Sequence, residues 1–125
     1  MDARLREGIR LFNAGRFFES HESLEDFYAG AEPEHKPFVE GLIQLAAACR
    51  MFRDFGEVQG SVRMARQAVI RLENYQPTYL GIKVKKLIQT MEGWTREIEA
   101  TETAKTNSAP REPMPKIPLQ RFLFL

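Results

Sequence analysis

The spacing of apolar residues predicts helices and no convincing strand. Apolar side chains recur every three or four residues in five stretches, the period of a helix with one buried face. Asp2 is a candidate N-cap for the first stretch, and Pro37 suits the first turn of the third. The five predicted helices run from about residue 2 to 13, 16 to 30, 37 to 54, 57 to 75 and 82 to 98.

The third predicted helix is apolar around nearly its whole circumference, from Phe38 to Phe52. In a small globular protein, such a helix is surrounded by other helices. Its polar exceptions are Glu40 and Gln44, one turn apart. We therefore expect an all-α antiparallel bundle of about five helices, with the third at its centre.

Two turns between predicted helices have similar sequences with glycine near the middle. They are Asn13-Ala14-Gly15-Arg16-Phe17-Phe18-Glu19 and Asp54-Phe55-Gly56-Glu57-Val58-Gln59-Gly60. Both resemble the turn of tetratricopeptide-type helical hairpins, but they lie about forty residues apart, against the 34 of that repeat. We expect shared hairpin geometry rather than a repeat array.

Composition changes after residue 100, and we expect a helical bundle domain over 1–100 and a proline-rich tail over 101–125. The prolines of the tail, from Pro110 to Pro118, are incompatible with a helix or a central strand. The chain then reaches Phe122-Leu123-Phe124-Leu125, which is too apolar to remain in water. We expect this apolar end to dock on the bundle or on a neighbouring copy.

Charge and cysteine content point to a soluble cytoplasmic protein. The net charge is +1 in 125 residues, and the arginines of the fourth helix have no base-stacking aromatic residues beside them. No apolar stretch is long enough to span a bilayer. The lone Cys49 lies in an apolar run and suits a reducing interior. We expect neither nucleic acid nor membrane as a partner.

The second predicted helix carries ionisable residues on a stripe that we expect to face the core. His21 shares this stripe with Phe17, Leu24 and Tyr28, and Glu25 follows His21 after one turn. Buried polar groups need specific partners. One interpretation is a buried hydrogen-bonded network of His21, Glu25 and Gln44 that fixes the second helix against the third.

The other interpretation is a functional site. His21 and Glu25 are candidate metal ligands one turn apart, and Glu40 would supply a third oxygen. A metal-dependent hydrolase or a small-ligand-binding protein would use the cluster of His21, Glu22 and Glu25. The pattern differs from the zinc-protease motif His-Glu-x-x-His, because Glu25 replaces its second histidine.

Two blocks of the sequence resemble the domain-of-unknown-function 309 family. They run from Leu11-Phe12-Asn13-Ala14-Gly15 through Ser20-His21-Glu22-Ser23-Leu24-Glu25, and over Gly41-Leu42-Ile43-Gln44-Leu45-Ala46-Ala47-Ala48. The resemblance covers residues 5–75 and implies a small all-α bundle without an established activity. The signature positions of the family fall on Glu19, His21, Glu22, Leu24, Glu25, Gly41 and Gln44.

The chain departs from the family pattern at three places. Tyr28 stands where the family usually has tryptophan, and Glu57 where it usually has asparagine. Many members carry a histidine near Arg50, and this chain has none there. If that histidine is a metal ligand, its absence favours the hydrogen-bonded network over a metal site.

The predicted function is therefore a non-catalytic interaction or scaffold domain with a buried His-Glu-Gln network. Its partner would be another protein or a second copy of this chain. The alternative remains a metal-dependent hydrolase or small-ligand-binding protein. We assign no cofactor, apart from a divalent metal at His21 and Glu25 under that alternative.

Overall fold

The chain is all-helical in the part that the structure, a computed structural model, describes, which is residues 1–104 and 113–121. The helices are α1 (Ala3–Asn13), α2 (Phe17–Gly30), α3 (Lys36–Phe55), α4 (Val58–Leu72) and α5 (Val84–Ala104). Short 3-10 turns cover Pro33–His35 and Glu73–Tyr75. These residues contain isolated β-bridges but no strand. The prediction of five helices is confirmed.

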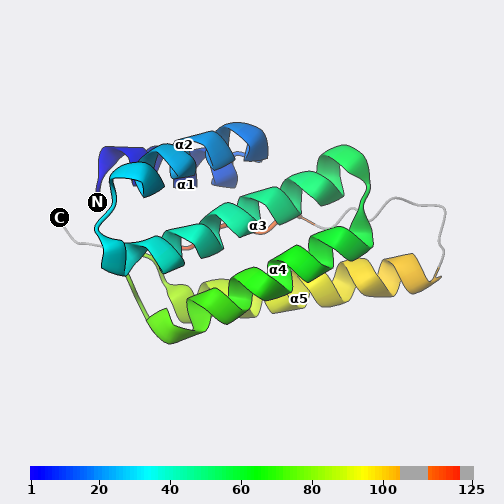
Figure 1. Cartoon of the computed structure of the whole chain (residues 1–125). Helices are drawn as coiled ribbons and strands as arrows, with labels where there is room; N and C mark the ends of the chain where they lie inside the picture. The colour runs from blue at the N-terminus through cyan, green and yellow to red at the C-terminus, as the bar shows by residue number, and fades with distance from the viewer. Residues whose placement is uncertain (105–112, 122–125) are drawn as a thin grey trace.

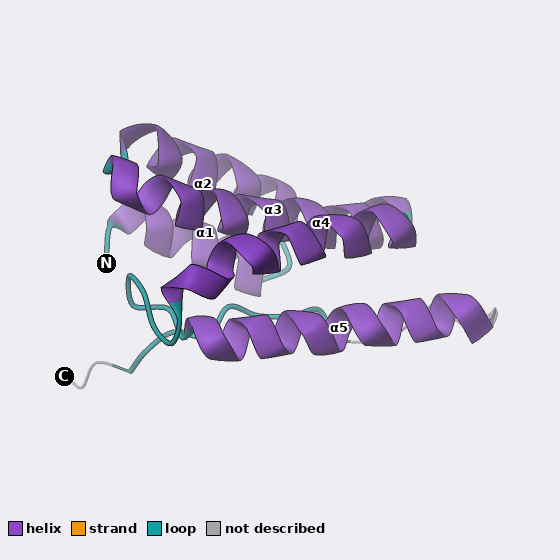
Figure 2. Ribbon diagram, turned by 60° about the horizontal axis from the view of Figure 1, so that its bottom comes forward, coloured by secondary structure: helices purple, strands orange, loops and turns teal. Residues whose placement is uncertain are grey.

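Each helix packs on the next one along the chain, and α3 lies in the middle (Figure 1). In this view α2, α3 and α4 form a front layer, α1 lies behind α2, and α5 lies behind α4; Figure 2 shows the same bundle from below. Nine residues of α3 are buried, among them Phe38, Leu42 and Leu45. The central position of the third helix is therefore confirmed, and its apolar circumference explains it.

The two predicted glycine turns close the α1–α2 and α3–α4 hairpins. Gly15 has φ 79° and Gly56 has φ 64°, a conformation that side chains with a Cβ rarely adopt. After each glycine, the next amide donates back into the preceding helix: Arg16 to the Leu11 carbonyl at 2.9 Å and Glu57 to the Met51 carbonyl at 3.0 Å. Both turns therefore end one helix and start the next within a few residues.

The helix ends follow the sequence closely, with one exception. Asp2 caps α1 by accepting a hydrogen bond from the Arg4 amide at 2.8 Å, as predicted. Helix α5, however, continues to Ala104 and passes the predicted boundary at residue 100. Its last turn includes a hydrogen bond from the Thr101 hydroxyl to the Glu97 carbonyl, and the first proline of the tail comes only at Pro110.

The segment 113–121 runs between the end of α1 and the start of α5, behind α3 in Figure 1. Asn13 holds it through both of its side-chain amide atoms, at 2.7 Å from the Ile117 amide and 3.1 Å from the Ile117 carbonyl. The Lys83 amide donates to the Pro118 carbonyl at 2.9 Å. Ile117 is buried and belongs to the core, so this segment links the first helix to the last. The apolar end at 122–125 lies outside the described residues.

Within the described residues, no helix is long and apolar enough to cross a membrane. The cytoplasmic location stays a prediction. Cys49 is fully buried in α3, and this burial raises the pKa of its thiol far above the ordinary value. The residue therefore packs as a small apolar side chain, in line with the sequence.

Candidate functional site

His21 and Glu25 lie at the surface of α2 and are not a buried pair. Their side chains are 37% and 51% exposed. The His21 Nε2 atom lies 3.8 Å from the Glu25 Oε1 atom, which is longer than a hydrogen bond. The predicted buried His-Glu-Gln network is therefore wrong.

The buried stripe of α2 explains this difference. It consists of Phe17, Ser20, Leu24 and Phe27, because α2 packs on α1 and α3 together. At 3.6 residues per turn, His21 lies about 80° away from the centre of this stripe. The sequence analysis placed Tyr28 on the buried stripe, and this shifted the expected centre of the stripe towards His21. In the structure Tyr28 is only partly buried.

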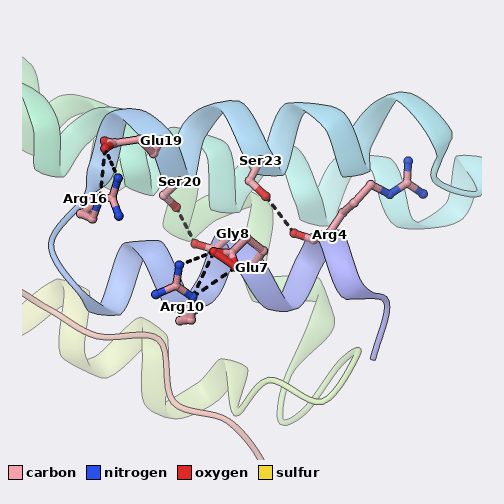
Figure 3. A network of polar contacts seen from close by, with 8 residues as sticks. All are labelled: Arg4, Glu7, Gly8, Arg10, Arg16, Glu19, Ser20 and Ser23. Atoms are coloured by element: carbon pink, nitrogen blue, oxygen red, sulfur yellow. Dashed lines mark hydrogen bonds and ion pairs between the residues drawn. The ribbon is translucent and has the colours of Figure 1, made fainter.

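Ser20, the residue before His21, makes the buried polar contact of this helix. Its hydroxyl donates to the Gly8 carbonyl of α1 at 2.7 Å, and its side chain is fully buried (Figure 3). Nearby, the Ser23 hydroxyl donates to the Arg4 carbonyl at 3.1 Å. Sequence reasoning missed Ser20, although it stands three residues after Phe17 and four before Leu24, on the core-facing side of the helix.

Glu40 and Gln44 face α4 rather than α2. The Arg71 guanidinium donates to the Gln44 side-chain oxygen at 3.0 Å and lies 3.4 Å from a Glu40 carboxylate oxygen. The predicted contacts of Glu40 and Gln44 with His21 and Glu25 are thus wrong. Glu40 and Gln44 instead contact Arg71, an arginine of the fourth helix whose role the sequence alone did not reveal. Because one guanidinium reaches two α3 side chains, it holds α4 in a defined position along α3.

Glu19 and Glu22 also lie outside any buried network. Glu19 accepts two hydrogen bonds from Arg16, at 2.8 and 3.0 Å, and this contact holds the pKa of its carboxyl below the ordinary value (Figure 3). Glu22 is exposed. The six candidate residues therefore do not meet in one cluster.

The metal interpretation lacks a ligand set in the part of the chain that the structure describes. There, no group of three or more histidine, cysteine, aspartate and glutamate side chains comes close enough together to hold a metal ion. His21 and Glu25 supply two candidate ligands, and Glu40 is engaged by Arg71 on the other side of α3. A histidine and a carboxylate at this spacing form a solvent-accessible pair on the helix surface.

An exposed contact between α2 and α3 was not anticipated from the sequence. The Arg50 guanidinium carbon lies 4.5 Å from the ring centre of Phe18 and 5.2 Å from that of Phe55. Phe18 is 45% exposed and Phe55 66% exposed. We refer to Phe18, Arg50 and Phe55 as the arginine–phenylalanine patch. His21 and Glu22 follow Phe18 after one turn of α2, so the patch adjoins part of the predicted cluster.

The family model described as Domain of unknown function (DUF309) matches residues 5–64, a range that includes both sequence blocks and the arginine–phenylalanine patch. No curated protein matches the chain. The resemblance seen in the sequence is therefore confirmed over residues 5–64, which run from α1 into α4 and match the DUF309 family model.

Proposed function

We propose that this protein is a non-catalytic interaction domain that binds another protein through the arginine–phenylalanine patch. The observation that carries this proposal is the exposure of two phenylalanine rings on either side of one arginine. Arginine and aromatic side chains are enriched among the residues that contribute most to protein–protein binding.

The geometry of Arg50 supports a partner that offers a carboxylate. Its side chain is 39% exposed, and its guanidinium makes no hydrogen bond with the other described residues. The nearest carboxylate oxygen, from Asp54, lies 3.7 Å away, beyond hydrogen-bond distance. The two rings restrict the guanidinium, so less side-chain entropy is lost when it binds. A carboxylate beside an apolar side chain would match Arg50 and the exposed rings together.

The metal-dependent alternative has less support. It would need further ligands or an enclosed site around His21 and Glu25, and both side chains are open to solvent. No specific contact in the structure favours turnover of a substrate at this surface.

The proposal is tested by identifying a partner and then measuring its binding with purified components. Proteins captured from a lysate of the source organism by the wild type would be identified by mass spectrometry, expressed and titrated by calorimetry. Phe18→Ala with Phe55→Ala, and Arg50→Ala alone, are expected to raise the dissociation constant at least about tenfold. Arg6→Ala, at an exposed arginine of α1 away from the patch, is the matched control and should bind as the wild type does.

Two results would contradict the proposal. One is a purified partner that binds the patch variants with wild-type affinity, because binding then uses another surface. The other is a turnover activity of the purified protein that His21→Ala abolishes, which would support the enzymatic alternative.

A further inference from the structure

A groove runs along the outer side of the α4–α5 helix pair. It consists of two adjoining hollows of about 530 and 390 Å³. Arg66 and Ile70 line both hollows, so the two form one continuous depression. The groove lies on other helices than the arginine–phenylalanine patch of α2 and α3.

The lining of the groove is apolar where it is deepest and exposes one large apolar residue. Val62, Val69 and Met91 are buried at its base. Ile70 is 66% exposed and stands where the two hollows meet. An apolar residue that protrudes between charged rims is a common feature of a protein contact surface.

The two rims carry opposite charges along the larger hollow, whereas the smaller hollow has Glu73 on the α4 side and both Glu92 and Arg96 on the α5 side. On the α4 side of the larger hollow lie Arg63 and Arg66, and on the α5 side lie Glu99 and Glu102. Arg66 already bridges the groove, with its guanidinium 2.7 Å from the Glu99 carboxylate. The side chains of Arg63 and Glu102 make no ion pair or hydrogen bond with other described residues. Along the larger hollow, each rim therefore offers charges that the opposite rim of another copy would complement.

We propose that a second copy of this chain docks on this groove around a twofold axis that runs along it. Such an axis places α4 of each copy against α5 of the other, so that the basic and acidic rims of the larger hollow meet twice. Arg63 of each copy then faces Glu102 of the other copy, and the two Ile70 side chains approach each other near the axis. An isologous contact requires a self-complementary surface, and this pattern of charges provides it.

Sedimentation analysis of the purified chain from micromolar to millimolar concentration tests this proposal. The wild type is expected to show a monomer–dimer equilibrium. Ile70→Asp should raise its dissociation constant at least tenfold, because it places two carboxylates at the apolar centre of the interface. Leu119→Asp is the control, since Leu119 is an apolar residue with 39% exposure outside both the groove and the arginine–phenylalanine patch, and it should dimerise as the wild type does. A wild type that stays monomeric, or an Ile70→Asp variant that dimerises normally, would overturn the inference.

A charge reversal tests the orientation of the two copies. Arg63→Glu and Glu102→Arg should each weaken the homodimer, because like charges then face each other twice. When the two variants are mixed, every such contact pairs opposite charges again, so native mass spectrometry should detect the mixed dimer in excess of either homodimer. A statistical mixture would overturn the proposed orientation. None of these results bears on the arginine–phenylalanine patch, so a monomeric wild type would leave the proposed function standing.

Discussion

The α1–α2 and α3–α4 hairpins use the same turn but differ in how freely the side chains between their helices can move. Each has a glycine with positive φ at the turn, Gly15 or Gly56. At the fifth position after that glycine, each has a buried serine that donates to a carbonyl of the preceding helix at 2.7 Å. These are Ser20 to Gly8 and Ser61 to Ala48. The similarity of the two turn sequences therefore extends to a buried hydrogen bond.

The difference lies in the side chain that faces a glycine within each hairpin. A Cβ added to Gly8 would lie 2.7 Å from the Leu24 Cδ2 atom, and Leu24 is a fully buried branched side chain. A Cβ added to Gly60 would lie 2.6 Å from the Met51 Cε atom, the end of a flexible and half-buried side chain. Similar turns thus do not determine packing tightness, which depends on the side chains that meet.

The largest predicted effect is at Gly8, because its fully buried neighbour Leu24 cannot move aside as Met51 can at Gly60. Gly8→Ala should lower the free energy of unfolding by about 1–2 kcal/mol, because the new methyl group forces Leu24 out of a filled core. Gly60→Ala should range from no change to about 1 kcal/mol of stabilisation, because Met51 can move and alanine favours the helix. Urea unfolding followed by circular dichroism measures both variants.

A double variant shows whether Leu24 is responsible. In a Leu24→Ala background the methyl group of Gly8→Ala has room, so the additional cost should disappear and the two substitutions should couple by about 1 kcal/mol or more. Equal costs for Gly8→Ala and Gly60→Ala in the wild-type background would show that the two hairpins pack alike.

The buried serines should give the next largest effect, and the two hairpins should then agree. Ser20→Ala and Ser61→Ala each remove one buried hydrogen bond to a backbone carbonyl, so each should lower the free energy of unfolding by about 1 kcal/mol. Ser23→Ala is the matched control, because its hydroxyl makes a longer bond, 3.1 Å, at a more exposed position. If only Ser20→Ala lowers the free energy of unfolding, the hydrogen bond of Ser61 does not stabilise the second hairpin.

The fully buried thiol of Cys49 can report on the second hairpin separately. The Ser61 hydroxyl bonds the carbonyl of Ala48, the residue just before Cys49. If the hairpins open separately, Ser61→Ala should speed native-state labelling by a thiol reagent about fivefold, the factor that corresponds to about 1 kcal/mol. Ser20→Ala should change the rate much less. Equal acceleration by both variants would mean that the bundle opens as a whole.

The helices were predictable because their apolar periods, glycine turns and caps are local features of the sequence. The positions of the helix ends at Asp2, Gly15 and Gly56 depend on residues within one turn, and all three were anticipated. The angular position of the buried stripe was not, because it depends on which neighbours a helix meets. Helix α2 packs on two helices at once, and this placed Ser20 inside and His21 outside.

The polar candidates were harder to predict because long side chains reach across helices. Arg71 lies far from Glu40 and Gln44 in the sequence, and nothing local to any of them indicates the contact. The arginine–phenylalanine patch likewise combines α2 with the end of α3. Sequence analysis located helices with notable polar residues, but the partners of those residues follow only from the tertiary arrangement.

The smallest predicted effect separates His21 from its neighbour Ser20 on the same helix. His21→Ala and Glu25→Gln should each change the free energy of unfolding by less than about 0.5 kcal/mol, because both side chains are open to solvent and lie 3.8 Å apart. The same urea titrations that measure Ser20→Ala provide the comparison. Losses above about 1 kcal/mol for both variants would restore the buried network predicted from the sequence. A small effect on stability together with weaker partner binding would instead place His21 in the contact surface beside Phe18.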